Sequence, residues 1–235
     1  MTDWSVETGK YLPALDQALA LVNVAPRRPE NIPPGPFDQA LTPLQSVLYR
    51  AVTLYEVGLW LRGRETLQAL KLLWTEGYLS PAAALARLMF ELWGSCHYQT
   101  RALTRYSSDQ ELGPLAKVVD KLFEGVRDEV LLPWGVPAGE KPIHVLDLVR
   151  ALEADEPGSE AMYNDLCESS HANQPRFLEW WLTGKLGGNW ANEVVRRRGH
   201  ELLGRTVSTV QTATEGLVQD ATDGLQRCGL LYDAD

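Results

Sequence analysis

Cysteine is scarce in this sequence of 235 residues, and so is histidine. The chain has three cysteines and four histidines. The cysteines, at positions 96, 167 and 228, lie far apart and show none of the close spacings of metal sites or disulfide frameworks. We therefore expect free thiols in a reducing compartment and no metal site.

Positive charge is also scarce. The chain has 22 Lys and Arg and 31 Asp and Glu, which gives a formal net charge of −9. A surface that binds nucleic acid needs clustered Lys and Arg. The net charge thus gives no support to an RNA or nucleotide partner, although it does not exclude one. The run "RRR" at 196–198 is the one candidate basic patch, and the solvated face of a helix explains it better.

Long apolar runs and targeting signals are absent as well. The first residues, "MTDWSVETGK", have neither a basic segment nor an apolar one, so we expect no signal peptide. The longest apolar runs are far shorter than a membrane span requires. These absences predict a cytoplasmic protein with no membrane partner.

Strand signals and cofactor motifs are missing too. The sequence has no run of alternating β-branched residues, no Asn-Gly hairpin turn, and none of the GxxxxGK, GxGxxG, HExxH or GxSxG motifs. We expect no cofactor and an all-α fold. Helical spacing of apolar residues predicts helices over 4–23, 38–61, 65–77, 80–105, 109–131, 143–154, 159–171, 175–184 and 191–228.

The expected organisation is a single helical domain over 1–235. Within it, 1–36 is an N-terminal helix with a proline-rich tether, and 37–235 is the core of a multi-helix bundle. "RGRE" at 62–65 is expected to turn or kink the chain. Ser80 is expected to cap the next helix, with Pro81 at its first position.

The long C-terminal helix gives the clearest pattern. Its apolar or small residues recur at spacings close to alternating three and four, the seam of a helix packed in a bundle. Gly216 and Gly224 weaken it, so a break near 224 is expected. We also expect the protein to form a homodimer through this helix. The seam residues are Leu203, Val207, Val210, Thr214, Leu217, Ala221 and Cys228.

Arg87 and Glu91 are the charged residues that we consider the best candidates for a functional site. They lie four residues apart in "ARLMFELW", so they can pair on one face of a helix that is apolar around most of its circumference. Such a pair is expected to be buried. Two explanations for a buried pair stay open. Either a structural polar network stabilises it, in which case Arg87→Ala would lower the free energy of unfolding by about 3–5 kcal/mol, or the pair binds a ligand.

Tyr163, Cys167 and His171 form a second helical row in "YNDLCESSH". We expect this row to face Arg87 and Glu91 across the bundle, which would bring Arg, Glu, Tyr and His into one polar cluster. His171 would be the acid or base, with Arg87 and Glu91 beside it. Arg87 and Tyr163 would bind a small anionic ligand. The alternative is that His171 only caps its helix.

The two motifs resemble a family of bacterial all-helical proteins that pair an Arg-x-x-x-Glu helix with a later Tyr-x-x-Leu-Ser-x-x-x-His helix. The resemblance covers roughly residues 45–175, and Cys167 stands where the family has serine. The family is similar in general shape to the HEPN bundles, many of which are ribonucleases. The Arg and His spacing of active HEPN enzymes is missing, since Arg196 and His200 have only three residues between them.

Three functions follow from these patterns. The first is a binding or regulatory protein of bacterial stress or phage defence, whose polar cluster holds a small anionic ligand. The second is a HEPN-like ribonuclease or another phosphoester hydrolase. The third is an interaction module that offers Trp180, Trp181 and Trp190 to a protein partner.

Overall fold

The structure, a computed structural model, describes residues 9–34, 41–76, 78–123, 141–170 and 193–233. For 79–80, 169–170 and 193–202 it describes the helix backbone alone. These ranges contain helices and no strand, so the all-α prediction is confirmed. The elements are α2 (Leu12–Val24), α3 (Pro43–Glu56), the π-helix η1 (Val57–Gly63), α4 (Arg64–Thr75), α5 (Leu79–Asp109), α6 (Leu112–Phe123), α8 (Val145–Asp155), α9 (Ser159–Ser170) and α11 (Glu193–Asp233).

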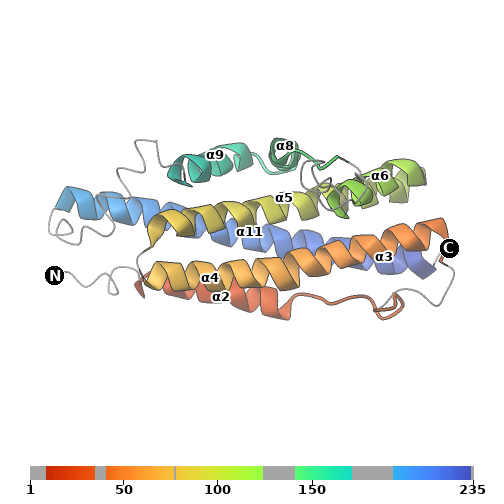
Figure 1. Cartoon of the computed structure of the whole chain (residues 1–235), viewed down its shortest axis with the longest axis horizontal. Helices are drawn as coiled ribbons and strands as arrows, with labels where there is room; N and C mark the ends of the chain where they lie inside the picture. The colour runs from red at the N-terminus through yellow and green to blue at the C-terminus, as the bar shows by residue number, and fades with distance from the viewer. Residues whose placement is uncertain (1–8, 35–40, 77, 124–140, 171–192, 234–235) are drawn as a thin grey trace, which may run out of the picture.

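The long helices α5 and α11 lie side by side at the centre of the bundle (Figure 1). Helices α2 and α3 pack on α11, whereas α6, α8 and α9 pack on α5. The multi-helix bundle with a long C-terminal helix is therefore confirmed. None of the described helices has the length and apolar character that a membrane span needs.

Prolines and caps set the starts of the early helices. Pro13 lies in the first turn of α2, where its missing N–H costs nothing. Helix α3 begins at Pro43, later than the expected start at 38, because Thr42 and Gln45 form a reciprocal capping box. Helix α5 begins at Leu79 with Tyr78 as its N-cap, so the prediction of Ser80 as the cap was wrong.

The sequence predicted a turn or a kink at 62–65, and the chain does not turn there. Helix α3 runs into η1 and η1 into α4 without interruption, so that Pro43–Thr75 forms one long helical path (Figure 1). The local irregularity appears as seven residues of π-helix instead of a turn. A π-helix widens the helix locally and is rare beyond a single turn.

Helix α11 continues through Gly216 and Gly224, so the break expected near 224 is also wrong. A Cβ at Gly216 would lie 2.2 Å from Cε2 of Trp93, and one at Gly224 would lie 2.2 Å from Cζ of Tyr55. These positions accept large aromatic rings against the helix backbone. The packing that the glycines permit offsets their low helix propensity.

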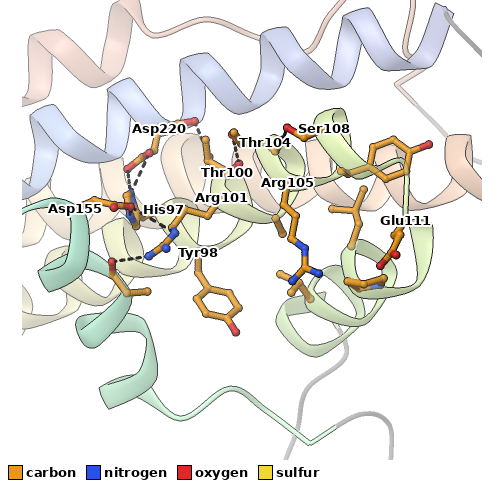
Figure 2. Close-up of a pocket in the computed structure, with 16 residues that line it drawn as sticks. His97, Tyr98, Thr100, Arg101, Thr104, Arg105, Ser108, Glu111, Asp155 and Asp220 are labelled. Atoms are coloured by element: carbon orange, nitrogen blue, oxygen red, sulfur yellow. Dashed lines mark hydrogen bonds and ion pairs between the residues drawn. The ribbon is translucent and has the colours of Figure 1, made fainter.

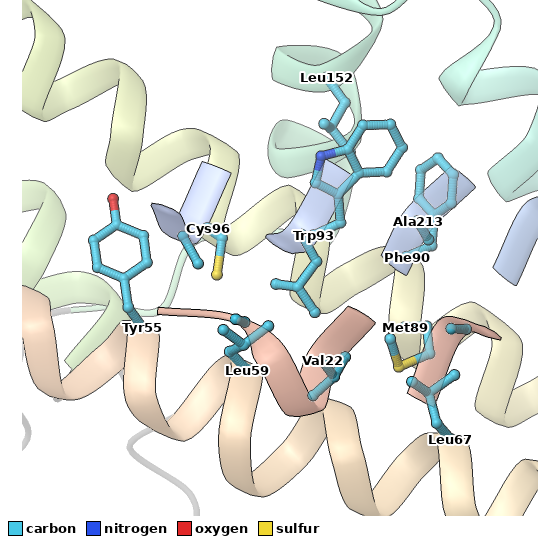
Figure 3. Close-up of a cluster of buried hydrophobic side chains, with 14 of the residues drawn as sticks. Val22, Tyr55, Leu59, Leu67, Met89, Phe90, Trp93, Cys96, Leu152 and Ala213 are labelled. Atoms are coloured by element: carbon cyan, nitrogen blue, oxygen red, sulfur yellow. The ribbon is translucent and has the colours of Figure 1, made fainter. Parts of the chain in front are cut away.

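The core lies between the α3–η1–α4 path, α5 and α11, and Figure 3 shows part of it. Phe90 and Trp93 meet edge to face with ring centroids 5.3 Å apart. Every residue of the predicted α11 seam is buried, which confirms the spacing argument.

Candidate functional site

The structure brings three of the four predicted site residues together. Nε of Arg87 lies 2.9 Å from Oε1 of Glu91, and the Tyr163 hydroxyl donates to the same oxygen at 3.0 Å. The Arg87 guanidinium also lies 5.9 Å from the centre of the Tyr163 ring. His171 and the three tryptophans at 180, 181 and 190 lie outside the described residues.

We call Arg87, Glu91 and Tyr163 the Arg87 cluster, and its two charged side chains are less buried than the sequence predicted. The side chains of Arg87 and Glu91 are 35% and 25% exposed, while Tyr163 is buried. Burial, and then the negative charge of Glu91, raise the pKa of Tyr163, so its hydroxyl stays protonated and donates. Burial would lower the pKa of Arg87, but the hydrogen bond and charge of Glu91 outweigh it, and that pKa is raised. The cluster is thus a fixed ion pair with a neutral donor.

A second polar cluster, which the sequence did not predict, is centred on His97. Its Nδ1 lies 3.2 Å from Oδ2 of Asp220, and its Nε2 lies 3.0 Å from Oδ2 of Asp155 (Figure 2). We call His97, Asp155 and Asp220 the His97 junction. It joins α5, α8 and α11, because each helix supplies one of the three residues.

The His97 junction favours an imidazolium ion. Burial would lower the pKa of His97, but the hydrogen bonds and charges of Asp220 and then Asp155 outweigh it, so the pKa is raised. A neutral imidazole carries a single N–H and cannot donate to both carboxylates, whereas the cation can. His97 therefore holds its proton to a higher pH than a free histidine and acts as a positive link between two acidic residues.

Further hydrogen bonds fix Asp220 in place. Trp93 donates from Nε1 to Oδ2 of Asp220 at 2.9 Å. The Thr100 hydroxyl donates to the backbone oxygen of Asp220 at 3.0 Å and lies 2.7 Å from the Tyr55 hydroxyl. Because Thr100 has one hydroxyl proton, Tyr55 is the donor in that pair. This network sets the register of α11 against α5.

The His97 junction forms one end of a cavity of about 660 Å³. Residues of α5, α6 and α8 make most of its wall. The volume lies in the range of small-molecule sites, about 300–1,000 Å³. Figure 2 shows Tyr98 and Arg105 on the side of α5 that faces away from α11. We call this space the α5–α6–α8 cavity.

Two arginines one helical turn apart line the α5–α6–α8 cavity. Arg101 donates from Nη1 to the oxygen of Ala151 at 3.1 Å, and its Nε lies 3.4 Å from Asp155. Arg105 donates from Nε to Asp109 at 3.0 Å. Each guanidinium has five N–H groups, so both keep donors for a ligand. Their side chains are 49% and 67% exposed, which leaves them accessible.

One sequence signal for this site was available. His97, Arg101 and Arg105 are each four residues apart, which places them in one row along α5. His144 is the N-cap of α8, and its Nδ1 accepts from the N–H of Leu146 at 3.2 Å. Within the described ranges, no group of three or more His, Cys, Asp or Glu residues could hold a metal ion.

Comparison of the chain with protein-family models, curated proteins and solved structures finds no match. The resemblance to the Arg-x-x-x-Glu family and to HEPN bundles therefore stays a prediction, and the site is interpreted on its geometry alone.

Proposed function

We propose that this protein is a ligand-binding helical bundle that takes a small, doubly charged organic anion in the α5–α6–α8 cavity. The observation that carries the proposal is the pair Arg101 and Arg105, one turn apart on the wall of a cavity of about 660 Å³. Two guanidinium groups at this spacing match a phosphate monoester or a dicarboxylate, since each can donate two parallel hydrogen bonds to an anionic group.

Three basic side chains and three carboxylates line the α5–α6–α8 cavity; two of the carboxylates are paired, and Glu111 is the third. The acidic residues Asp155 and Asp220 already face His97, and Asp155 also faces Arg101. Their negative charge is therefore largely compensated by their neighbours. Among the residues that the structure describes, Arg105 pairs through Nε with Asp109 alone, at the protein surface, and surface pairs of this kind contribute little.

The rest of the wall suits the organic part of such a ligand. Tyr98, Leu115 and Val118 offer ring and aliphatic surface, while Ser108 and Glu111 offer polar groups for a hydroxyl or amine. The apolar surface would cover the body of the ligand, and the polar groups would fix its orientation.

The test is a thermal-shift and calorimetric screen with nucleoside monophosphates, sugar phosphates and dicarboxylates. Wild type and Arg105→Gln are compared, with Arg150→Gln as the matched control. Arg150 is an equally exposed arginine with one surface carboxylate partner, Asp147, and it is not part of the cavity wall. We expect at least one class to raise the melting temperature of wild type and of the control, and Arg105→Gln to lose most of that rise.

Two results would refute the proposal. One is a screen in which no anion shifts wild type at millimolar concentration. The other is a shift that Arg105→Gln keeps in full.

The hydrolase and interaction-module hypotheses depend on His171 and on the tryptophans at 180, 181 and 190, so both stay predictions. The same holds for a ligand at the Arg87 cluster, for the homodimer, for a cytoplasmic location and for a role in stress or phage defence.

A further inference from the structure

A second, smaller cavity of about 200 Å³ lies beside the π-helix. Its wall comes from α3, η1, α5 and α6, so it is separate from the α5–α6–α8 cavity and shares no lining residue with it. Most of its wall is aliphatic, made by Leu54, Val57, Leu92 and Leu122. We call it the η1 cavity.

The π-helix shapes this space. The segment Val57–Gly63 supplies three of the lining residues, Val57, Gly58 and Arg62. Apart from its own helix, a Cβ at Gly58 would meet Sγ of Cys96, at 3.4 Å, and no other atom of the described residues within 4 Å. The missing side chain of Gly58 therefore contributes directly to the empty volume. π-helical segments are uncommon and often mark functional sites.

The amide of Gln99 and the hydroxyl of Ser95, two polar groups of the η1 cavity, already bond inside the protein. Gln99 donates its amide N–H to the oxygen of Ala51 at 2.9 Å, and the Ser95 hydroxyl donates to the oxygen of Glu91 at 2.9 Å. Arg62 differs from them. It is exposed and makes no hydrogen bond or ion pair with another residue that the structure describes.

We propose that the η1 cavity binds a monocarboxylate with a compact apolar body, which enters the cavity while its carboxylate pairs with Arg62. An apolar cavity of about 150 Å³ is enough for a benzene ring, so 200 Å³ fits one aromatic ring or a chain of about six carbons. A single arginine at the rim of an aliphatic cavity matches a single carboxylate. This proposal does not rest on the function assigned to the first cavity.

The experiment uses phenylacetate and hexanoate as probes, with uncharged phenylacetamide for comparison, and measures binding by calorimetry and NMR titration. Arg62→Gln is expected to weaken phenylacetate binding about tenfold or more, because it removes a charge-assisted hydrogen bond. It should leave phenylacetamide unchanged. Arg64→Gln, which changes an exposed arginine two residues further along that does not line the cavity, is the control and should bind like wild type.

A second variant tests the cavity itself. Gly58→Ala places a methyl group in the space beside Cys96 without a close contact, and it improves helix propensity. It should melt at or above the temperature of wild type and still bind both aromatic probes more weakly. This combination separates loss of the cavity from loss of the fold.

The outcomes are distinct. The proposal would be overturned if wild type did not bind the probes. It would also be overturned if Gly58→Ala and Arg62→Gln both bound phenylacetate as tightly as wild type does. If Arg105→Gln abolishes phenylacetate binding while Arg62→Gln keeps it, the probe occupies the α5–α6–α8 cavity. The η1 proposal would then fail while the proposed function stands.

Discussion

Alanine at position 224 should destabilise this protein, although the same substitution in most helices is favourable. Gly224 lies inside α11, where alanine would gain about 0.5–1 kcal/mol in helix propensity. The new Cβ would lie 2.2 Å from both Cζ and Oη of Tyr55. Carbon atoms prefer about 3.5–4 Å, so the ring would have to move by more than about 1 Å.

Tyr55 has little freedom to move. Its side chain is fully buried in the core, and its hydroxyl lies 2.7 Å from that of Thr100. Overpacking costs about 1–3 kcal/mol, and a lost buried hydrogen bond costs about 1 kcal/mol. After subtraction of the propensity gain, Gly224→Ala should lower the free energy of unfolding by about 1–3 kcal/mol. Each kcal/mol corresponds to a fall of about 2–4 °C in melting temperature for a chain of this size.

The assay is urea and thermal unfolding of wild type, Gly224→Ala and Gly204→Ala. Gly204 is the matched control, because it lies in the same helix and, among the described side chains, its added Cβ would meet Tyr11 alone, at an ordinary 3.8 Å. Gly204→Ala should be slightly stabilised. The double variant Gly224→Ala with Tyr55→Leu should lose less stability than the two single variants added together. The close approach of α11 to α3 would be refuted if Gly224→Ala proved as stable as Gly204→Ala.

Three further outcomes follow. Arg87→Ala should lower the free energy of unfolding in urea by only about 1 kcal/mol, because both groups of its ion pair are partly exposed; a loss of 3 kcal/mol or more would contradict this. Because the pKa of His97 is raised, its protonation stabilises the fold fully below about pH 6.5, and this stabilisation is lost as pH rises through the raised pKa. The melting temperature of His97→Gln should therefore vary less with pH than that of wild type. Maleimide should label Cys167 fastest in the native protein, since Cys96 and Cys228 are buried and burial raises the pKa of both thiols, that of Cys228 to about 12; equal rates would contradict this.

The sequence alone determined the local features of this protein. Helix hydrogen bonds join residues four apart, and apolar spacing marks the face that is buried, so the helices and the buried seam of α11 were predictable. The pairing of Arg87 with Glu91 was predictable for the same reason, since both lie on one helix. Small errors remained at helix starts: the capping box of Thr42 and Gln45 fixes the start of α3, and α5 begins one residue before the predicted cap Ser80.

The tertiary structure decided the features that depend on distant residues. The His97 junction was not predictable from the sequence, because Asp155 and Asp220 lie 58 and 123 residues further along the chain than His97. Gly224 was interpreted as a weak point of α11. Its aromatic neighbour, Tyr55, comes from α3, and the local sequence of α11 does not show it. Both cavities likewise form between several helices and not within one of them. Local periodicity fixes which face of a helix is buried, but not which helix covers it or at what register, and that choice depends on how all the side chains pack together.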